Sequence, residues 1–408
     1  MADIFHLTVG QARRFLLIKQ GLLGARLFKG REGALAYVRQ AGCIQFDPVD
    51  VCGKNAELTL LSRVGGFEKK TLRDLLYKDR LLVDYPDKEL SIFPVEDWPY
   101  FKAYRTNSFL HGRRFEGLEE LEEQALEYIG EHGPVSADSL PIDGEIFWHS
   151  SIHWSGNWHG RSKAARSVLE QMYTDGRLVI HHKTGTRKYY DLAARHIPEA
   201  ILTAADPCAD DMERVKWRIL RRIGAVGMLQ NRNSTAFLGI PMTTEQRNAA
   251  FAELEREGII LPVSVEGVRI PFFIRAEDES LLYDAVNNGK SLTPRCEFLA
   301  PLDPFLWDRK LISTIFGFDY TWEIYTPADK RVYGHYVLPI VYGEGFVGRI
   351  EASADHKRKV LAVKNVWLEP GVRKTKKLIG AIERSIARLA RFNDCAPDTD
   401  ALQYHEGK

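Results

Sequence analysis

Residues 161–192, RSKAARSVLEQMYTDGRLVIHHKTGTRKYYDL, decide the fold of this 408-residue chain. Apolar residues recur on one face of a helix predicted over 161–175, namely Ala165, Val168, Leu169 and Met172. Gly176 ends that helix. The stretches LVIHH, KTGT and RKYYDL then predict a strand, a turn and a second strand. A helix followed by a hairpin is typical of the winged helix-turn-helix, whose second helix can enter a DNA major groove.

The same order of elements recurs downstream. A helix is predicted from Val215 to Ile223, where GAVG is expected to break it, and another is predicted over 244–257. IILPVSV, EG and VRIPFFI form a further predicted hairpin. In both copies, the glycine that ends the helix and the glycine in the hairpin turn are nine positions apart. This repetition predicts a second module of the same kind.

The two ends of the chain differ from each other. A looser copy near the N-terminus has helices expected around Val9–Leu16, Ala34–Ala41 and Asn55–Val64, and a short wing from LLVDY and LSIF. The last hundred residues contain strand-like runs, namely WEIY, YGHYVLPIVYG, FVGRIEASAD and VLAVKNVWLE. A GEG turn and a basic helix over 373–391 complete this region.

The predicted fold class is therefore α+β, with three tandem winged-helix modules and a β-rich C-terminal domain. The expected boundaries are 1–115, 116–200 and 201–292 for the three modules, 293–395 for the β-rich domain and 396–408 for a tail.

Composition narrows the class of protein. The hydrophobic fraction of 45% is enough for packed cores and excludes wholesale disorder. No apolar run approaches the roughly 18 residues of a membrane span, and the start, MADIFHLTVGQARR, lacks a signal-peptide core. The five cysteines are scattered, without a CxxC pair, which favours reduced thiols. We expect a cytoplasmic, nucleoid-associated monomer that does not bind membranes.

The formal net charge of +1 conceals strong segregation. Residues 116–145 carry ten acids and no Lys or Arg, whereas residues 357–391 carry eleven basic residues against two acids. Residues 151–190 carry seven basic residues against two acids, and these follow the predicted helix and wing. Clustered cations bind phosphates because each contact releases counterions. The expected DNA-binding residues are Arg161, Lys163, Arg166, His181, Lys183, Arg187 and Lys188.

The segment CIQFDPVDV is the most distinctive candidate for chemistry. In an extended segment, Gln45 and Asp47 share a face, while Ile44 and Phe46 are expected to anchor into the core. Pro48 ends the strand and holds the pair where a ligand can reach it. A carboxylate beside an amide can orient and polarise a water molecule. The structural alternative is a strand that ends in an Asp-Pro turn.

From Gln45-Phe46-Asp47 onward, the sequence resembles the winged-helix DNA glycosylases of the AlkZ/YcaQ group, which release bulky alkylated bases and unhook interstrand crosslinks. The similarity extends over about residues 7 to 390. Its segments are IQFDPVDV, LTLLSRVGGF, FPVEDWP, GTRKYYDLAARHIP, LDPFLWDRK, FGFDYTWEIYTPADKRVYGHYVLPI and GRIEASAD. The resemblance implies three winged-helix modules with a β-rich C-terminal domain, and double-stranded DNA carrying alkylated bases as the partner.

The resemblance also implies a catalytic motif of Gln, an apolar residue and then Gln or Asp, which Gln45 and Asp47 match in its Gln/Asp variant. The expected activity is monofunctional hydrolysis of the glycosidic bond of N7- or N3-alkylated purines, without a cofactor or metal. Two departures bear on substrate range. Pro86-Asp87-Lys88 stands where relatives commonly carry Trp-x-His, and Ala56-Glu57 stands where they often carry paired histidines.

Alternatives remain open. A winged-helix regulator would bind DNA with Gln45 and Asp47 in a structural role, and a docking scaffold would need no exposed cations on its wing. His149, His153 and His159 could form a metal site, although their spacing fits loosely and no metal is expected. Three nearby tryptophans could stack on bases, but core packing is favoured; they are Trp148, Trp154 and Trp158.

Overall fold

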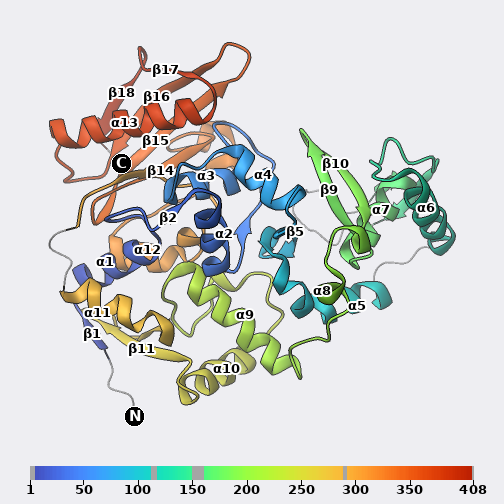
Figure 1. The fold of residues 1–408 in the computed structure, drawn as a ribbon. Helices are drawn as coiled ribbons and strands as arrows, with labels where there is room; N and C mark the ends of the chain where they lie inside the picture. Colours follow the sequence, from blue (N-terminus) through green and yellow to red (C-terminus); the bar gives the residue numbers. More distant parts are fainter. Residues whose placement is uncertain (1–4, 112–116, 149–159, 288–291, 407–408) are drawn as a thin grey trace. The chain divides into compact units, whose positions relative to one another are not determined.

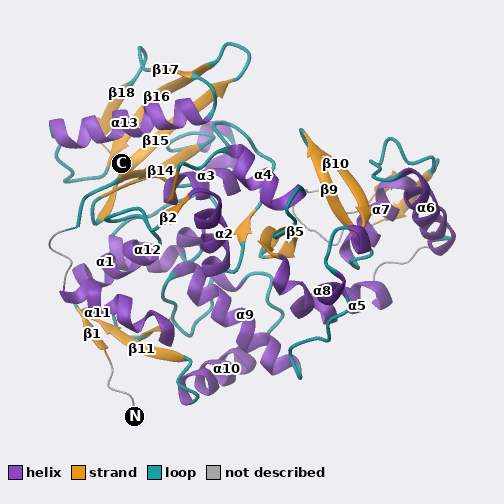
Figure 2. Cartoon of the chain, in the orientation of Figure 1, coloured by secondary structure: helices purple, strands orange, loops and turns teal. Residues whose placement is uncertain are grey.

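The structure is a computed structural model that describes residues 5–111, 117–148, 160–287 and 292–406 (Figure 1). The chain divides into two compact units. The first unit comprises residues 1–72 and 215–408, and the second comprises residues 73–214. Both units mix helices and strands, as the sequence predicts (Figure 2). Across the described ranges, no helix is long and apolar enough to cross a membrane.

The described part of the second unit contains helices and three antiparallel pairs of strands. Its helices are α5 (Lys102–His111), α6 (Leu118–His132), α7 (Ala164–Thr174) and α8 (Glu199–Leu202), preceded by α4 (Lys69–Tyr77) at the boundary. Its strands are β5 (Leu82–Asp87), β6 (Glu89–Pro94), β7 (Glu145–Trp148), β8 (Gly160–Lys163), β9 (Leu178–Thr184) and β10 (Arg187–Leu192). The rings of Tyr85, Trp98, Phe101 and Tyr173 pack together in its core.

The helix predicted over 161–175 begins later than expected. Residues 160–163 form β8, which pairs antiparallel with β7, and α7 starts only at Ala164. Backbone hydrogen bonding to a partner strand therefore overrides the local helical pattern. Arg161 and Lys163 consequently belong to a strand and do not begin a recognition helix.

The hairpin predicted at 178–192 is present. Strands β9 and β10 pair antiparallel around a turn that contains Gly185, whose φ of +62° is the left-handed conformation that favours glycine. The register shifts between Tyr189 and Tyr190, so that His181 is the extra residue of a β-bulge. A bulge re-aims side chains, and here it brings the rings of two consecutive residues, His181 and His182, into contact.

The N-terminal and middle segments of the first unit form helices and small sheets. The N-terminal elements are β1 (Phe5–Leu7), α1 (Val9–Lys19), β2 (Phe28–Lys29), α2 (Gly30–Ala41), β3 (Ile44–Gln45), α3 (Asn55–Arg63) and β4 (Val64–Gly65). The middle elements are α9 (Asp211–Val226), α10 (Thr244–Arg256), β11 (Ile260–Val265), β12 (Phe272–Arg275) and α11 (Glu279–Asn287). Helix α9 continues through Gly224 and ends before Gly227, so GAVG breaks it as the sequence predicted, at the last residue of that stretch.

The hairpin of β11 and β12 gains a third strand from the start of the chain. Strand β1 pairs parallel with β11, in the register Phe5 to Val263. A parallel pair needs a long connection between its strands, and here more than 250 residues intervene. The N-terminal segment is thereby tied to the predicted third module.

The C-terminal part contains a six-stranded sheet with the order β13-β14-β15-β16-β17, in which β18 also pairs with β16. Its elements are β13 (Cys296–Phe298), α12 (Arg309–Phe316), β14 (Val337–Tyr342), β15 (Gly345–Asp355), β16 (Val360–Leu368), α13 (Lys376–Phe392), β17 (Ala396–Asp398) and β18 (Gln403–Glu406). Helix α13 packs on this sheet (Figure 1). WEIY is not a strand, because residues 323–325 form a 3-10 turn.

Candidate functional site

The candidate catalytic pair lies where β3 ends. Gln45 is the last residue of that strand, and Asp47 follows two residues later. Both side chains face inward, with exposed fractions of only 4% for Gln45 and 6% for Asp47. Ile44 is fully buried as predicted, and Phe46 is partly buried. The polar pair is thus buried together with Ile44, whose side chain lies on the opposite face of the extended segment.

Asp47 is held by the backbone that follows it. The N–H of Val49 donates a 2.9 Å hydrogen bond to Oδ1 of Asp47. Burial raises the pKa of Asp47 above its usual range, and the Val49 hydrogen bond opposes that shift because it stabilises the charged form. A raised pKa makes this carboxylate a stronger base than an exposed aspartate.

Asn55, the first residue of α3, connects the pair to the rest of the first unit. Its Nδ2 donates a 2.9 Å hydrogen bond to the main-chain carbonyl of Gln45, and its Oδ1 accepts one of 2.9 Å from the N–H of Leu302. Asn55 is only 2% exposed, so both hydrogen bonds are shielded from water. Sequence reasoning missed this residue because the bond to Leu302 joins positions 247 residues apart.

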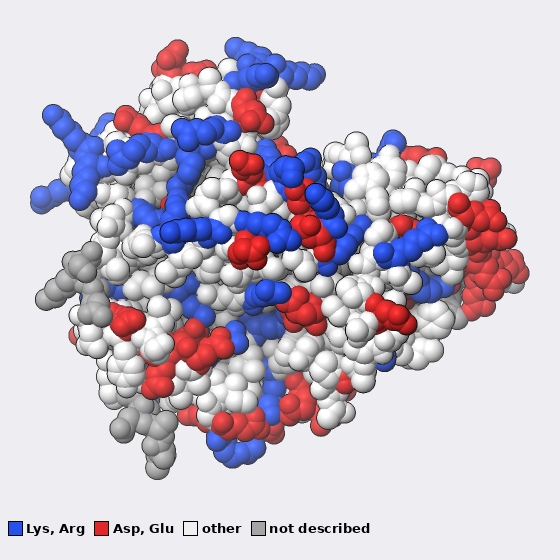
Figure 3. All heavy atoms as spheres, in the orientation of Figure 1, with Lys and Arg blue, Asp and Glu red and all other residues white. Residues whose placement is uncertain are grey.

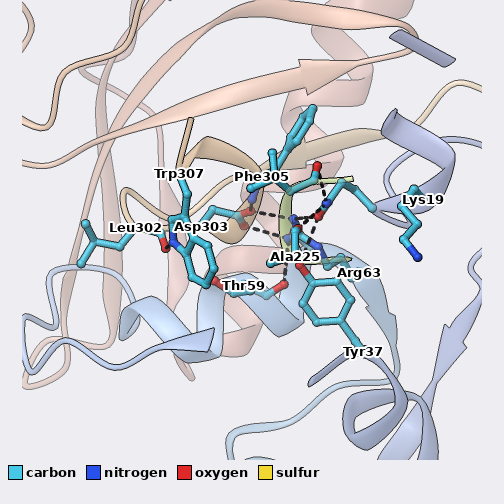
Figure 4. A network of polar contacts seen from close by, with 12 residues as sticks. Lys19, Tyr37, Thr59, Arg63, Ala225, Leu302, Asp303, Phe305 and Trp307 are labelled. Carbon is cyan, nitrogen blue, oxygen red and sulfur yellow. Dashed lines mark hydrogen bonds and ion pairs between the residues drawn. The ribbon is translucent and has the colours of Figure 1, made fainter. Parts of the chain in front are cut away.

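A buried ion pair stands next to this connection (Figure 4). Arg63, at the end of α3, donates to both carboxylate oxygens of Asp303 at 2.8 and 2.6 Å, and both side chains are fully buried. Arg63 also donates to the side-chain oxygen of Gln20 and lies over the ring of Tyr37. Because Leu302 precedes Asp303, the ion pair and the Asn55 hydrogen bonds anchor the two ends of α3 to one loop.

The cations predicted to bind DNA are largely engaged with acids of the second unit. One carboxylate, that of Asp138, contacts Lys163 at 3.3 Å and Arg187 at 3.2 Å. Arg166 contacts Glu170 at 3.2 Å, one helical turn away. These three basic side chains remain more than half exposed, so water screens the ion pairs and each contributes little stability. The side chain of Arg161 lies outside the described residues.

Two further wing cations face the protein. The ammonium of Lys183 forms an ion pair with Asp84 on β5, and both side chains are largely buried. The ammonium of Lys188 lies 5.6 Å from the ring centre of Tyr173. Of the predicted set, Lys163, Arg166 and Arg187 are thus the exposed members, while Lys183 holds the wing to β5.

His181 belongs to the one group of potential metal ligands that the described residues contain. Single ligand atoms of His181, Asp191 and His196 lie within 4.8 Å of one another. His196 already contacts Asp191 at 2.7 Å, and Arg195 donates to the same carboxylate at 3.0 Å. Both carboxylate oxygens of Asp191 therefore already have partners within the protein. The predicted alternative at His149, His153 and His159 lies outside the described residues, as do Trp154 and Trp158 and the side chain of Trp148.

The two departures from the expected motifs lie in ordered elements. Pro86 and Asp87 end β5, and Lys88 forms the tight turn to β6 with only 5% of its surface exposed. Ala56 is buried in the first turn of α3. Glu57, beside it, accepts a hydrogen bond from the N–H of Lys54 and caps that helix.

Comparison with known proteins identifies the family. The model of the AlkZ-like DNA glycosylases matches residues 38–392, which is most of the chain. The structure is also similar to that of the Streptomyces sahachiroi DNA glycosylase AlkZ, with a TM-score of 0.63 and 16% sequence identity. That alignment covers 98% of this chain and 100% of the other. The chain belongs to the AlkZ-like DNA glycosylase family.

Proposed function

We propose that this DNA glycosylase hydrolyses the N-glycosidic bond of N7- and N3-alkylated purines, including bulky adducts and interstrand crosslinks, with Asp47 and Gln45 activating the water. The observation that carries the proposal is the burial of this polar pair at the end of β3, where burial raises the pKa of Asp47. Burying a carboxylate costs free energy unless it is compensated. Perturbed acids of this kind are concentrated at functional sites.

The leaving group explains why one carboxylate suffices. Alkylation at N7 or N3 makes the purine cationic, so its glycosidic bond is already weakened and needs no strong acid. Departure of the base leaves an oxocarbenium-like sugar, whose charge an anion stabilises. In this mechanism Asp47 stabilises the cation and removes a proton from the attacking water, while Gln45 orients that water.

The supporting framework is the set of contacts around β3. Asn55 holds the backbone of Gln45, and Val49 holds the carboxylate of Asp47, so neither position depends on solvent. We further propose that the three helix-and-hairpin regions act as winged-helix modules that grip duplex DNA. Such a grip suits crosslinked bases, which cannot be flipped out of the duplex as most glycosylases require.

Base release from defined duplexes tests the proposal. The wild-type protein is incubated with duplex carrying N7-methylguanine or a nitrogen-mustard crosslink, and abasic sites are detected by alkaline cleavage. Asp47→Asn should bind the duplex like wild type and release almost no base. Borohydride should trap no protein–DNA adduct, because the hydrolysis is monofunctional. Unchanged turnover by Asp47→Asn would exclude Asp47 as the catalytic carboxylate.

Sequence-specific binding without base release would instead favour the regulator alternative. A regulator would protect one preferred sequence in a footprint, commonly as a two-fold dimer. The glycosylase should bind many sequences with similar affinity and favour those that carry a lesion.

A further inference from the structure

We propose that a basic face of the C-terminal domain, formed by Lys377, Arg384 and Arg391 on α13, binds the phosphate backbone of duplex DNA. This surface is called the α13 face below, and none of its three residues belongs to the predicted DNA-binding set or to the candidate catalytic pair. The proposal rests on duplex DNA being the substrate of this glycosylase.

The three side chains form a line along α13. Lys377, Arg384 and Arg391 are spaced seven residues apart, and each is exposed. Two helical turns cover 7.2 residues, so residues seven apart lie almost above one another, at intervals of about 10.5 Å. The three cations therefore form a row of positive charge along one side of the helix, and a row of this kind can bind the phosphates of a duplex.

The cations of the α13 face differ from Arg388 in their contacts within the described part of the chain. Among the residues that the structure describes, none of Lys377, Arg384 and Arg391 forms an ion pair or a side-chain hydrogen bond. Arg388 on the same helix differs, because its guanidinium contacts the buried carboxylate of Glu297. One cation of α13 thus serves the fold, and the three on the α13 face are available to a ligand.

The cations at the start of α13 do not contribute to helix stability, whereas Arg391, in the last turn, does. Lys376 and Lys377 lie in the first turn of α13, which contains no acid, and the helix dipole is positive there. A further cluster, Lys357-Arg358-Lys359, forms the turn between β15 and β16, and Lys359 has a φ of +54°. Figure 3 shows Lys and Arg side chains gathered over the C-terminal domain, in contrast to the acids gathered over α6. Binding of an external anion accounts for this arrangement.

The chemistry of the surface favours DNA over a lipid bilayer. An interfacial helix needs an exposed apolar face beside its cations. In α13 the apolar face is buried against the sheet; its residues are Leu378, Ala381, Ile382, Ile386, Leu389 and Ala390. What α13 presents outward is charge, which binds phosphates through counterion release.

The salt dependence of binding to undamaged duplex tests the proposal. The variant combines Lys377→Ala, Arg384→Ala and Arg391→Ala, all exposed positions whose change should leave the melting temperature near that of wild type. Each phosphate contact contributes about 0.9 to the slope of log K against log salt concentration. We expect the slope to fall by about 2.7 if all three cations contact phosphates, and the affinity at low salt to fall accordingly.

A matched variant controls for net charge. Lys310→Ala, Lys330→Ala and Lys364→Ala remove the same charge from exposed positions on other elements, outside the helix-and-hairpin regions, and this variant should keep the wild-type slope. Equal slopes for the α13 variant and wild type would overturn the proposal. An equal decrease of the slope in the α13 variant and in the control variant would overturn it as well. Because the readout uses undamaged duplex, failure of the proposed excision chemistry would leave this result intact.

Discussion

The side-chain amide of Asn55 donates a hydrogen bond to the main-chain carbonyl of Gln45, and the carbonyl oxygen of the same amide accepts one from the N–H of Leu302. One buried side chain therefore ties the strand that carries the candidate catalytic pair to the loop before α12. The precision of the candidate site depends on this connection, because catalytic groups need a supporting shell that fixes their geometry.

Replacing Asn55 with Ala should lower kcat with little change in DNA affinity. The change leaves the Gln45 carbonyl and the Leu302 N–H buried without that partner, which costs about 1–3 kcal/mol for each group. Single-turnover excision and equilibrium binding, measured well below the melting temperature, separate the two effects.

Ser385→Ala is the matched control for Asn55. Ser385 is also buried in the first unit and donates a 2.8 Å hydrogen bond to the carbonyl of Cys296, remote in sequence from the candidate pair. The Ser385→Ala variant should be less stable than wild type but should have the same kcat. Equal losses of kcat in both variants would show that Asn55 acts only through global stability.

Asp47→Asn should raise the thermal stability of the protein at neutral pH. The pKa of Asp47 is raised in the native state by burial, so ionisation of this group disfavours folding. That penalty is fully present above the native-state pKa and disappears below the unfolded-state pKa of about 3.9. The melting-temperature difference between Asp47→Asn and wild type should therefore shrink as the pH falls toward 4. A constant difference would show that burial of charge is not its cause.

Removing one partner of the buried pair Arg63–Asp303 should destabilise the protein strongly. Arg63→Met or Asp303→Leu alone leaves a buried charge without its main counter-ion, which typically costs about 3–5 kcal/mol. The double variant should recover part of this loss, because no isolated charge remains. Urea unfolding of the four proteins in a double-mutant cycle measures the coupling, and additive losses would contradict it.

The histidines at the base of the wing should make stability sensitive to mildly acidic pH. Burial, followed by the positive charge of Arg80, lowers the pKa of His181, and burial likewise lowers the pKa of His196 despite its bond to Asp191. A lowered pKa means that the unfolded state binds protons more readily. Stability should therefore be full above the unfolded-state pKa of about 6.5 and fall as the pH drops below it.

His181→Gln measures that dependence. Urea midpoints at pH 7.5 and pH 5.5 should differ less for the variant than for wild type, since one of the two titrating histidines is gone. His356→Gln, at an exposed position in the turn between β15 and β16, provides the control. An unchanged pH dependence in His181→Gln would exclude His181 as a source.

Local patterns predicted the elements that depend on near neighbours. The wing of β9 and β10, the helix α10 and the strands β14 to β16 were all found where alternation, helical periodicity and glycine turns indicated. These elements form between residues close in sequence, so composition and spacing carry the information. The basic helix was also expected, although only the structure distinguishes Arg388, bound to Glu297, from the exposed α13 face.

Predictions were wrong where a distant or unseen partner decided the conformation. Residues 160–163 form a strand because β7 pairs with them, not a helix as their own pattern suggested. Gln45 and Asp47 are buried together with Ile44, because the first unit covers both faces of this segment. A single sequence does not reveal which face of a short strand will be covered.

The sequence by itself determined the family, the mixed α and β character, and the Gln45-Phe46-Asp47 motif, since these reside in residue types and short spacings. Only the tertiary structure decided what surrounds that motif. Asn55 meets Leu302, and Arg63 meets Asp303, across more than 230 residues of chain. Such partners are determined by the free energy of burying polar groups in pairs, which depends on the whole fold. This pairing produces no periodic pattern in the sequence from which it could be predicted.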